Sequence, residues 1–497
     1  MIRKVLVANR GEIAVRIIRA CHELGLGAVA IYSDADRTAM HVRLADQAYR
    51  VGPPPPSESY LSIANVINAA VQSGADAIHP GYGFLAENPR FAQACLEADL
   101  TFIGPEFETI RLLGDKVQAR RFMRRAGAPI VPGSDEDPGT DLPTAAERLG
   151  YPLLIKAASG GGGKGIRLVR SREELAVALD IARREAKGAF GDDTVYLERI
   201  VEGARHIEFQ ILGDRYGNVI HLGDRECSIQ RRHQKLVEET PSRALTPELR
   251  REMGEVALLA ARAAGYSSAG TVEFLLDATG AFYFLEVNPR LQVEHAISEM
   301  VTGIDIVKEQ LRIAAGRKLR YRQEDVQPRG WAIECRILAE DPYDNFAPSI
   351  GKVTGVYEPA GPGIRVESGV YDGFEVTPYY DSLIAKIVAG GETRAEAITR
   401  MLRALEEFRI AGIKTNIPFC QQLLNSPSFI GGQFDTTFLE KRFSLTRERR
   451  QSLEVMAAIA AAYVEHVQHG RQATQHLQPD DGSISWRQAA RLEGLRE

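Results

Sequence analysis

The sequence is poor in cysteine and has no long apolar segment. Five cysteines are scattered among 497 residues, and no two of them form a Cys-x-x-Cys pair. This pattern is typical of reduced thiols in a cytosolic protein. No apolar stretch approaches the roughly 20 residues of a membrane-spanning helix, and the N-terminus lacks the apolar core of a signal peptide. The expected location is therefore the cytoplasm, without a membrane partner.

An excess of basic residues is also missing. The chain carries 61 Lys and Arg against 66 Asp and Glu, which gives a formal net charge of −5. A nucleic-acid or anionic-membrane partner would favour a basic surface, so neither partner is predicted. An anionic substrate would have to be attracted by local clusters of basic residues. The length suits about three domains of roughly 150 residues each.

Residues 1–114 lack the phosphate-binding fingerprint of a dinucleotide fold, although they alternate strands and helices. Strand-like runs and one helical run are found at Lys4–Ala8, Ile13–Leu24, Ala28–Tyr32, Ala75–His79 and Thr101–Ile103. The alternation predicts a Rossmann-like α/β domain, with a parallel sheet covered by helices on both faces. Asp34 and Asp36 follow the second strand, where a ribose-binding acid would stand. The first turn reads Asn-Arg-Gly-Glu instead of G-x-G-x-x-G, so we expect no nucleotide site here.

Composition changes further along the chain predict additional units. A Pro-, Gly- and Asp-rich loop at Val131–Pro143 leads into a small α+β insertion at 144–203. The chain becomes rich in strands from Gly330, and rich in Arg, Gln, Glu and Ala after about Phe443. We expect an N-terminal domain at 1–114 and a second domain at 115–330 with a mobile lid at about 131–203. A β-rich domain at 331–446 and a helical extension at 447–497 would follow.

A glycine-rich run, Ser159–Gly165, is the strongest local motif. Strand-like segments at Leu153–Ala157 and Ile166–Arg170 enclose it, whereas a dinucleotide motif opens a helix and a Walker loop continues with Lys-Ser/Thr. The run therefore predicts a hairpin flap whose backbone N–H groups close over phosphates. A flexible surface turn is the alternative. Lys156 at the base of the flap and Lys116 at a helix start are suited to binding phosphate.

A predicted β-hairpin at 271–288 places two carboxylates opposite each other. With a two-residue turn at 279–280, Glu273 faces Glu286, and strand alternation brings Asn288 to the same face. Like charges paired in this way destabilise a hairpin, and a divalent cation would remove the conflict. Oxygen ligands near a phosphate site favour Mg²⁺ or Mn²⁺. A solvated acidic face is the alternative, although the intervening residues are apolar.

Two further polar segments carry candidate anion ligands. In Pro289–His295, an extended conformation would direct Arg290, Gln292 and Glu294 to one side, which combines an anion fork with a general base. The dense polar run Glu226–Lys235 lies between apolar strands. Read alone, the first segment also fits a surface salt bridge, and the second fits a solvated loop equally well.

Together these motifs resemble biotin carboxylase, the ATP-grasp component of biotin-dependent carboxylases. The resemblance covers about residues 1–443 and includes Ala8–Ala14, His79–Leu85, Ser159–Gly165, Arg231–Lys235, Glu286–His295, Glu334–Ile337 and Pro378–Ser382. It implies an ATP-grasp fold for the second domain. It also implies carboxylation of biotin N1′ with ATP and bicarbonate through carboxyphosphate, the first half-reaction of a carboxylase.

The resemblance implies a role for each matching residue. ATP phosphates would be contacted by Lys116, Lys156, His206, Gly162 and Gly163. Adenine would be held by Glu198 and by the backbone at Arg199 and Val201, and the ribose would lie near Gln230 and His233. Two Mg²⁺ or Mn²⁺ ions would be bound by Glu273, Glu286 and Asn288. Bicarbonate would be held by Lys235, Arg290, Gln292 and Val293, with Glu294 as the base. Arg336 would stabilise the biotin enolate, and Tyr82 would line the biotin pocket.

Two departures from the family pattern leave these roles intact. Many bacterial relatives have Met-Asn-Thr-Arg in place of Val287–Arg290, and lysine in place of Arg199, whose implied contact is made by the backbone. The sequence has no Met-Lys-Met biotinylation site and no room for a carboxyltransferase. Biotin would therefore arrive on a carrier protein, a carboxyltransferase would be a further partner, and the resemblance implies a homodimer. The final acceptor (acetyl-CoA, another acyl-CoA or pyruvate) stays open.

Three other functions fit part of the sequence. A ligase that joins a carboxylate to an amine through an acylphosphate would need neither Arg336 nor the Arg231–Lys235 cluster. A non-catalytic nucleotide sensor would not need the complete set of metal and base candidates. A dinucleotide-dependent oxidoreductase is disfavoured by the strand that follows the glycine run.

The C-terminal extension carries apolar residues at helical spacing. They are Leu453, Met456, Ala460 and Val467, followed by Trp486, Ala489, Leu492 and Leu495. An apolar helical face requires burial against another surface. We expect a helix that docks onto the rest of the holoenzyme or, equally, onto its own core.

Overall fold

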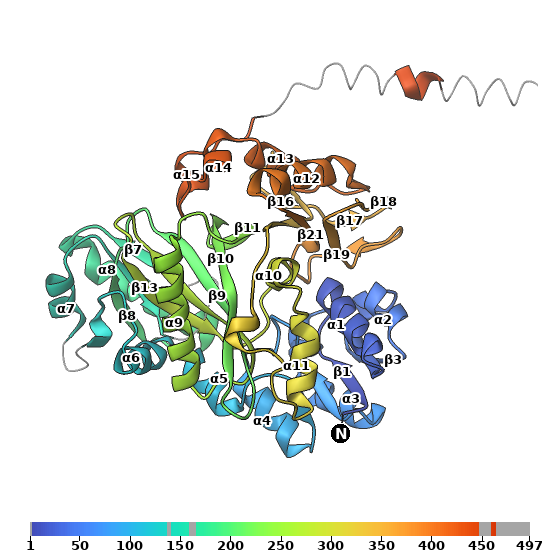
Figure 1. Cartoon of the computed structure of the whole chain (residues 1–497), viewed down its shortest axis with the longest axis horizontal. Coiled ribbons are helices and arrows are strands. Elements are labelled where there is room, and N and C mark those ends of the chain that lie inside the picture. The colour runs from blue at the N-terminus through green and yellow to red at the C-terminus, as the bar shows by residue number, and fades with distance from the viewer. Residues whose placement is uncertain (1, 137–140, 159–165, 447–458, 464–497) are drawn as a thin grey trace, which may run out of the picture. The chain divides into compact units, whose positions relative to one another are not determined.

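The computed structural model describes residues 2–136, 141–158, 166–446 and 459–463. The chain divides into two compact units, Met1–Leu445 and Thr446–Glu497 (Figure 1). In the second unit, the described residues beyond Thr446 form the helical stretch 459–463, which includes Ala460. The other apolar positions of the expected docking helix lie outside the described residues, and the docking hypothesis stays a prediction.

The N-terminal segment forms a parallel sheet, as its alternating pattern predicts. The strand order is β3-β2-β1-β4-β5, and all neighbouring pairs are parallel. The strands are β1 (Lys4–Val7), β2 (Gly27–Ser33), β3 (Gln47–Gly52), β4 (Ala77–His79) and β5 (Thr101–Phe102). The helices in this part are α1 (Gly11–Glu23), α2 (Met40–Leu44), α3 (Ile63–Ser73), α4 (Pro89–Glu97) and α5 (Phe107–Gly114). Strand β3 has no apolar run to predict it, because it lies at the edge of the sheet and most of its side chains are exposed or half-buried.

The acidic residues after β2 have partners within the fold. Asp36 accepts two hydrogen bonds from the Arg10 guanidinium (2.6 and 2.7 Å) and one from the Tyr60 hydroxyl (2.6 Å). Asp34 pairs with Arg50 at 2.7 Å. Both carboxylates therefore join neighbouring segments of the N-terminal sheet.

An eight-stranded sheet runs through the middle and C-terminal parts of the chain. Its order is β13-β12-β9-β10-β11-β14-β21-β19, and its neighbours are antiparallel. The strands are β9 (Arg205–Gly213), β10 (Val219–Arg231), β11 (Gln234–Thr240), β12 (Ser268–Leu276), β13 (Phe282–Asn288), β14 (Trp331–Leu338), β19 (Ile364–Ser368) and β21 (Leu383–Gly391). The boundary expected at residue 330 falls within this sheet, because β14 pairs directly with β11. The polar run Glu226–Lys235 forms the end of β10 and the start of β11 rather than a solvated loop, and much of it is buried.

A smaller antiparallel sheet carries the segments that flank the glycine run. Its order is β7-β6-β8, with β6 (Leu153–Ala157), β7 (Arg167–Val169) and β8 (Val195–Arg199). Helices α7 (Leu142–Leu149) and α8 (Arg172–Phe190) pack against it through a shared apolar cluster. Strands β6 and β7 are antiparallel partners, as the hairpin predicts. The run 159–165, with Gly162 and Gly163, lies outside the described residues.

The remaining helices cover the eight-stranded sheet and its ends. They are α6 (Lys116–Ala126), α9 (Pro247–Ala263), α10 (His295–Thr302), α11 (Ile306–Ala314), α12 (Arg394–Glu407), α13 (Ile417–Leu424), α14 (Pro427–Gly431) and α15 (Phe438–Lys441). Short strands complete the C-terminal part: β15 (Glu340–Asp341), β16 (Ala347–Pro348), β17 (Gly351–Lys352), β18 (Gly355–Tyr357), β20 (Glu375–Val376) and β22 (Arg409–Ala411). Helix α9 packs against β9 and β10, and α12 packs against β14 and β21 (Figure 1).

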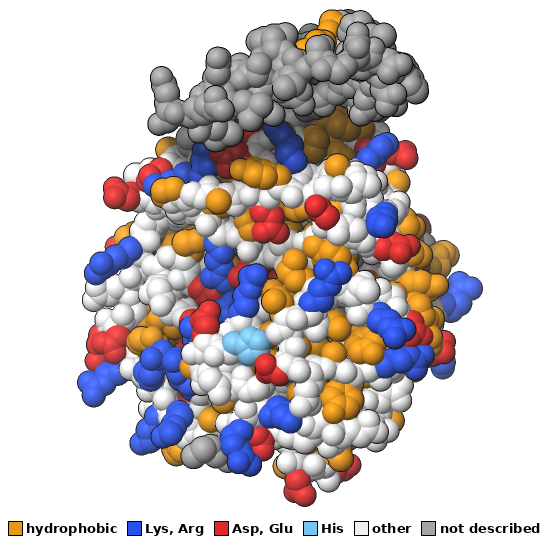
Figure 2. Space-filling model, turned by 90° about the vertical axis from the view of Figure 1, so that its right-hand side faces the viewer, with side chains coloured by type: hydrophobic (Ala, Val, Ile, Leu, Met, Phe, Trp, Pro, Cys, Tyr) orange, Lys and Arg blue, Asp and Glu red, His pale blue; other side chains and the backbone are white. Residues whose placement is uncertain are grey.

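The helices and the surface charge of the described residues are relevant to what the protein can bind. Within the described ranges, every helix is too short or too polar to cross a membrane. On the face shown in Figure 2, basic and acidic side chains are interspersed rather than gathered into areas of one sign. On this face, anion binding would therefore depend on basic groups that the fold brings together locally.

Candidate active site

One face of the eight-stranded sheet carries a row of charged side chains. Direct cross-strand partners share a face, and on β13, β12, β9 and β10 these partners are Glu286, Glu273, Glu208 and Arg225. The row continues on β11, β14, β21 and β19 with Glu238, Arg336, Lys386 and Glu367. Most of these side chains are buried. Buried charges are tolerated when they are paired, so the sequence of the sheet maintains a connected ionic network.

The hairpin β12–β13 places Glu273 opposite Glu286, but not by the turn that the sequence predicts. The Asp277 amide donates to the Ala281 carbonyl (2.9 Å), so the turn comprises residues 278–280 instead of 279–280. Gly280 adopts a φ of +89°, a conformation that favours glycine. An irregularity next to Glu273 then shifts the register by one residue and restores the pairing with Glu286. A bulge and a longer turn therefore compensate each other.

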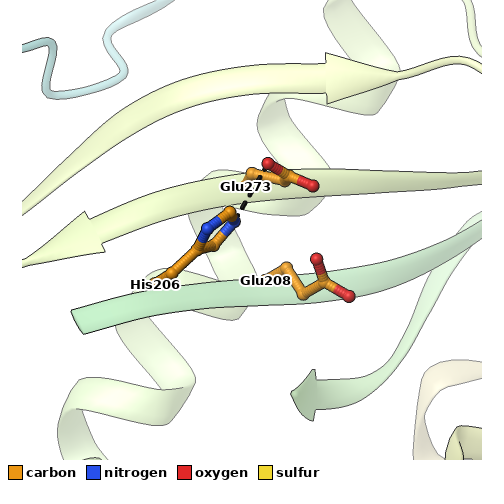
Figure 3. A group of neighbouring side chains, drawn as sticks. All are labelled: His206, Glu208 and Glu273. Carbon is orange, nitrogen blue, oxygen red and sulfur yellow. Dashed lines mark ion pairs between the residues drawn. The ribbon is translucent and has the colours of Figure 1, made fainter. Parts of the chain in front are cut away.

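Each of the two opposed carboxylates has basic partners of its own. Lys116 at the start of α6 lies 2.6 Å from Glu286, while Glu273 contacts Lys235 (3.0 Å) and His206 (2.9 Å). Burial alone would raise the pKa of Glu273, but Lys235 and His206 hold that pKa well below its usual range. In Figure 3, the His206 ring extends from β9 toward Glu273 on the adjacent strand β12, and Glu208 lies further along β9. The like-charge conflict of the hairpin is thus relieved by basic side chains.

The oxygen atoms at this hairpin fit a hard divalent cation. Asn288 ends β13, and its amide donates to Glu273 (2.9 Å), so that its side chain shares the face of both carboxylates. Carboxylate and amide oxygens are the ligands that Mg²⁺ takes in proteins. Glu286 is the most accessible of the three, with a quarter of its side chain exposed. An ion bound here would contact Glu286, the most exposed of these three residues, at the β13 end of the charged row.

The segment after β13 differs from its predicted conformation. Residues 289–294 form an irregular turn rather than an extended strand, and Glu294 stands at the N-terminal cap of α10. The side chains of Arg290 and Gln292 nevertheless lie together. Arg290 donates to the Gln292 side chain (2.8 Å), and the Gln292 amide lies 3.3 Å from Glu273. Strand alternation is therefore the wrong reason for the proximity of these residues, which side-chain hydrogen bonds maintain.

Glu294 is completely buried between two cations. One of its oxygens lies 2.6 Å from the Lys235 ammonium, and the other accepts a hydrogen bond from Arg336 (3.0 Å). Burial alone would raise the pKa of Glu294, yet Lys235, Arg336 and Arg225 hold that pKa well below its usual range. The carboxylate is consequently ionised, and each of its oxygens faces a basic side chain.

The structure adds two groups that the sequence motifs do not identify. Glu208 is buried on β9 and contacts both Arg225 and Lys235 at 2.5 Å. Glu87 precedes α4 and lies 3.2 Å from Arg290. The strand Arg205–Gly213 contains the pattern that could have revealed Glu208, since polar and apolar residues alternate while nearly all are buried. A polar face that is buried must have charged partners elsewhere in the chain.

Arg336 lies within the row on β14, and Tyr82 lies near the next member of the row, Lys386 on β21. The Arg336 guanidinium donates to Glu238 (2.6 Å) as well as to Glu294, which fixes its plane. The Tyr82 hydroxyl donates to Glu12 at the start of α1, and the Tyr82 ring lies near the Lys386 ammonium. Residues proposed for biotin are therefore connected to the bicarbonate candidates through buried charges.

The nucleotide candidates lie at the opposite end of the row. The Lys156 ammonium on β6 contacts Glu198, which also accepts from Arg120 (2.7 Å). The Arg199 amide donates to the Pro132 carbonyl (3.0 Å), so an adenine contact at this residue would use its carbonyl oxygen. Val201 follows β8 and is half-buried.

His206, Gln230 and His233 connect this end to β10. Gln230 donates to the His206 ring (2.7 Å) and to the Cys227 carbonyl (2.8 Å). Burial opposes protonation of His206, but the Glu273 carboxylate raises the pKa of this histidine above its ordinary value. His233 is exposed in the β10–β11 turn with a φ of +65°. Residues without glycine's freedom that adopt this conformation are uncommon outside turns and functional sites.

Glu12 gives the protein a pH-dependent stability, which is the first testable prediction. Burial raises the pKa of Glu12 from 4.5 to about 7. The folded chain therefore holds a proton that the unfolded chain releases, and the stability from this group is complete below pH 4.5 and lost as the pH rises through 7. A shift of this size corresponds to on the order of 3 kcal/mol.

Glu12→Gln removes this titration, so its thermal midpoint should fall less than that of the wild type between pH 5 and pH 8. Differential scanning fluorimetry of both proteins over this range measures the difference. Parallel curves for the two proteins would contradict the raised pKa.

Comparisons with known proteins agree along nearly the whole chain. Family models match for the N-terminal domain of biotin carboxylase (residues 1–110), the ATP binding domain of the carbamoyl-phosphate synthase L chain (115–322) and the C-terminal domain of biotin carboxylase (334–441). Biotin carboxylase 1 of Bacillus subtilis (strain 168) is 54% identical over 443 residues, which cover 88% of this chain and 98% of that protein. A pyruvate carboxylase subunit of Methanothermobacter thermautotrophicus is 52% identical over 444 residues, with 89% and 90% covered.

A solved structure agrees equally well. It is the biotin carboxylase domain dimer of 2-oxoglutarate carboxylase from Hydrogenobacter thermophilus, in complex with MgADP, ADP and bicarbonate. The TM-score is 0.86 at 52% identity, and the match covers 89% of this chain and 98% of that one.

Proposed function

This chain belongs to the biotin carboxylase family and catalyses the ATP- and bicarbonate-dependent carboxylation of biotin, and from this premise we propose which of its residues carry the reaction. The position of Glu294 is the observation that carries the proposal. This ionised carboxylate is buried between Lys235 and Arg336, on the same turn as Arg290 and Gln292. A base, an anion fork and a second guanidinium thereby meet beside the middle of the charged row.

The reaction begins with the activation of bicarbonate. Lys235 and Arg290 hold the anion, with Gln292 and the Val293 backbone as further ligands. Glu294 removes its proton, and the resulting oxygen attacks the γ-phosphate of ATP to give carboxyphosphate and ADP. Bound bicarbonate shares Lys235 with Glu294. The negative charge of the anion raises the pKa of the Glu294 carboxylate toward the range of an effective base.

Transfer to biotin follows from the breakdown of carboxyphosphate. This intermediate yields CO₂ and phosphate, and the phosphate removes the proton from biotin N1′. Arg336 stabilises the oxyanion that develops on the ureido oxygen, because Glu238 holds the guanidinium in a fixed plane. N1′ then attacks CO₂ to form carboxybiotin, with Tyr82 lining the pocket.

The nucleotide end of the site neutralises phosphate charge. Lys116, Lys156 and His206 provide positive charge there, and Glu273, Glu286 and Asn288 provide oxygen ligands for Mg²⁺. Bound Mg²⁺ supplies further neutralisation of the transferring phosphoryl group. Adenine contacts at Glu198, Arg199 and Val201, ribose contacts at Gln230 and His233, and flap contacts at Gly162 and Gly163 complete the proposed nucleotide site.

Partners follow from the same premise. We propose that biotin arrives on a carrier protein and that a carboxyltransferase uses the carboxybiotin. The domain dimer of the Hydrogenobacter relative supports a homodimer for this chain. The five cysteines are free and buried, which supports a reducing compartment such as the cytoplasm.

The proposal predicts a specific dependence of ATP turnover on bicarbonate and biotin. ADP release should require bicarbonate and increase when free biotin is added, because the γ-phosphate is transferred to the bicarbonate oxygen. Steady-state ADP release in CO₂-free buffer, with and without each addition, measures this. A ligase joining a carboxylate to an amine would instead release ADP with its amine substrate, and turnover independent of bicarbonate would overturn the proposal.

A further inference from the structure

Lys386 on β21 is a fully buried lysine beside the segment that holds the bicarbonate ligands. Its ammonium donates a hydrogen bond to the Val293 carbonyl oxygen (2.6 Å) and lies 3.5 Å from a Glu12 oxygen. The centroid of the Tyr82 ring lies 5.8 Å away. Lysine is rarely buried completely unless it is paired, and this lysine brings together three segments that are far apart in the sequence.

The hydrogen bond acts on the peptide unit between Val293 and Glu294. A peptide unit is planar, so a fixed carbonyl oxygen also fixes the direction in which the chain continues to Glu294. Residues 289–294 belong to no strand or helix, and regular backbone pairing therefore does not hold this segment. The ammonium of Lys386 supplies a contact that a sheet or helix would otherwise provide.

The preceding peptide unit is fixed in a similar way by His295. Its Nδ1 lies 2.9 Å from the Gln292 carbonyl oxygen. Burial, together with the Lys386 and Arg16 charges, holds the pKa of His295 well below its usual range, so the ring is neutral and donates from Nδ1. Because the Val293 amide belongs to the same peptide unit as this carbonyl, its direction is fixed as well.

We propose that Lys386 is a positioning residue for carboxylation, whose ammonium fixes the Val293–Glu294 peptide and so maintains the geometry of the base and of the bicarbonate ligands. The inference rests on the roles proposed above for Val293 and Glu294. Hydrogen bonds from a charged donor are the stronger kind, and misplacement of reacting groups by about 1 Å lowers rates by up to roughly a hundredfold. The same ammonium faces Glu12 and the Tyr82 ring, so it also ties this segment to the proposed biotin pocket.

Lys386→Met tests the proposal, since it keeps the apolar stem and removes the donor. We expect kcat/KM for bicarbonate to fall by about tenfold to a hundredfold, while the affinity for MgADP stays within twofold of wild type. Steady-state ADP release at saturating ATP and free biotin measures the first quantity, and isothermal titration calorimetry measures the second. Lys352→Met is the matched control, because Lys352 is exposed on β17 of the same unit, and its kinetics should be unchanged.

A second variant keeps the test valid if the loss of one buried charge prevents folding. Lys386→Met combined with Glu12→Gln removes both members of this pair, so that neither is left buried without the other. The double variant should fold and still show the bicarbonate defect. Failure of both variants to fold would mean that the lysine maintains the fold rather than the segment, and the proposal would be rejected.

The remaining outcomes are distinguishable. A folded Lys386→Met with wild-type kcat/KM for bicarbonate, or with bicarbonate and nucleotide affinities reduced in parallel, would overturn the positioning role. Glu294→Gln in the same assay separates this failure from a failure of the proposed site. If that variant is active, the site assignment itself is wrong, whatever the result for Lys386.

Discussion

Replacing Glu294 by glutamine is expected to lower bicarbonate-dependent ADP release by at least about a hundredfold, while nucleotide affinity and Mg²⁺ dependence are retained. Glutamine keeps the shape of the side chain and much of its hydrogen bonding, but it does not accept the proton of bicarbonate. The assay is steady-state ADP release with bicarbonate and biotin, alongside the affinity of both proteins for ADP.

The neighbours of Glu294 indicate that the variant will fold. Lys235 retains Glu208 and Glu273 as partners, and Arg336 retains Glu238. Neither cation is therefore left buried without a carboxylate, which is the usual cause of large destabilisation when an ion pair is broken. Glu358→Gln makes the same substitution at an exposed position and should leave turnover unchanged. Turnover of Glu294→Gln within a few-fold of wild type would mean that another group is the base.

The N-terminal sheet and the glycine hairpin were accessible to sequence reasoning because each depends on local pattern. Apolar runs separated by helical spacing describe strands β1, β2 and β4 closely, since these strands are largely buried, and the half-buried β5 is described by the same pattern. The edge strand β3 carries no such run. The pairing of β6 with β7 follows from the strand signatures on both sides of the glycines.

In the β12–β13 hairpin, the predicted pairing of the two carboxylates is correct but the predicted turn is not. Glu273 does face Glu286, but through a longer turn and a compensating irregularity in the register. A single sequence indicates that polar residues of two strands share a face, because alternation is a local property. It does not indicate a bulge, whose cost is compensated by contacts with other parts of the chain.

The charged row itself could not be assembled from the sequence. The ion pairs within and beside the row join positions that are distant along the chain: Lys235 with Glu294, Arg336 with Glu238, and Lys386 with Glu12. Such contacts depend on strand order in the eight-stranded sheet, which places β14 beside β11 and β21 beside β14. Local patterns identify a buried polar face, whereas only the topology identifies the partner that makes each buried charge acceptable.

Replacing Glu286 by glutamine is expected to lower turnover by at least about a hundredfold at ordinary Mg²⁺ concentrations, because stabilisation of transferring charge by a metal ion is worth several kcal/mol. Glutamine keeps the size of the side chain but removes the charge that a divalent cation requires. The fold should survive, since the side chains of Glu286 and Lys116 are each about a quarter exposed and water can solvate the released ammonium. Steady-state ADP release at increasing Mg²⁺ measures the loss and its partial recovery.

A metal role for Glu286 must be separated from its contact with Lys116. Because the two groups lie 2.6 Å apart, Glu286→Gln also removes the partner that orients a proposed phosphate ligand. Electron paramagnetic resonance of Mn²⁺ in the presence of ADP distinguishes the two effects, since the variant should bind Mn²⁺ at least about tenfold more weakly if the carboxylate is a ligand. Lys116→Met should lower turnover without changing Mn²⁺ affinity, and the exposed Glu255→Gln on α9 should change neither quantity. If Glu286→Gln binds Mn²⁺ as tightly as the wild type, the carboxylate orients Lys116 and is not a metal ligand.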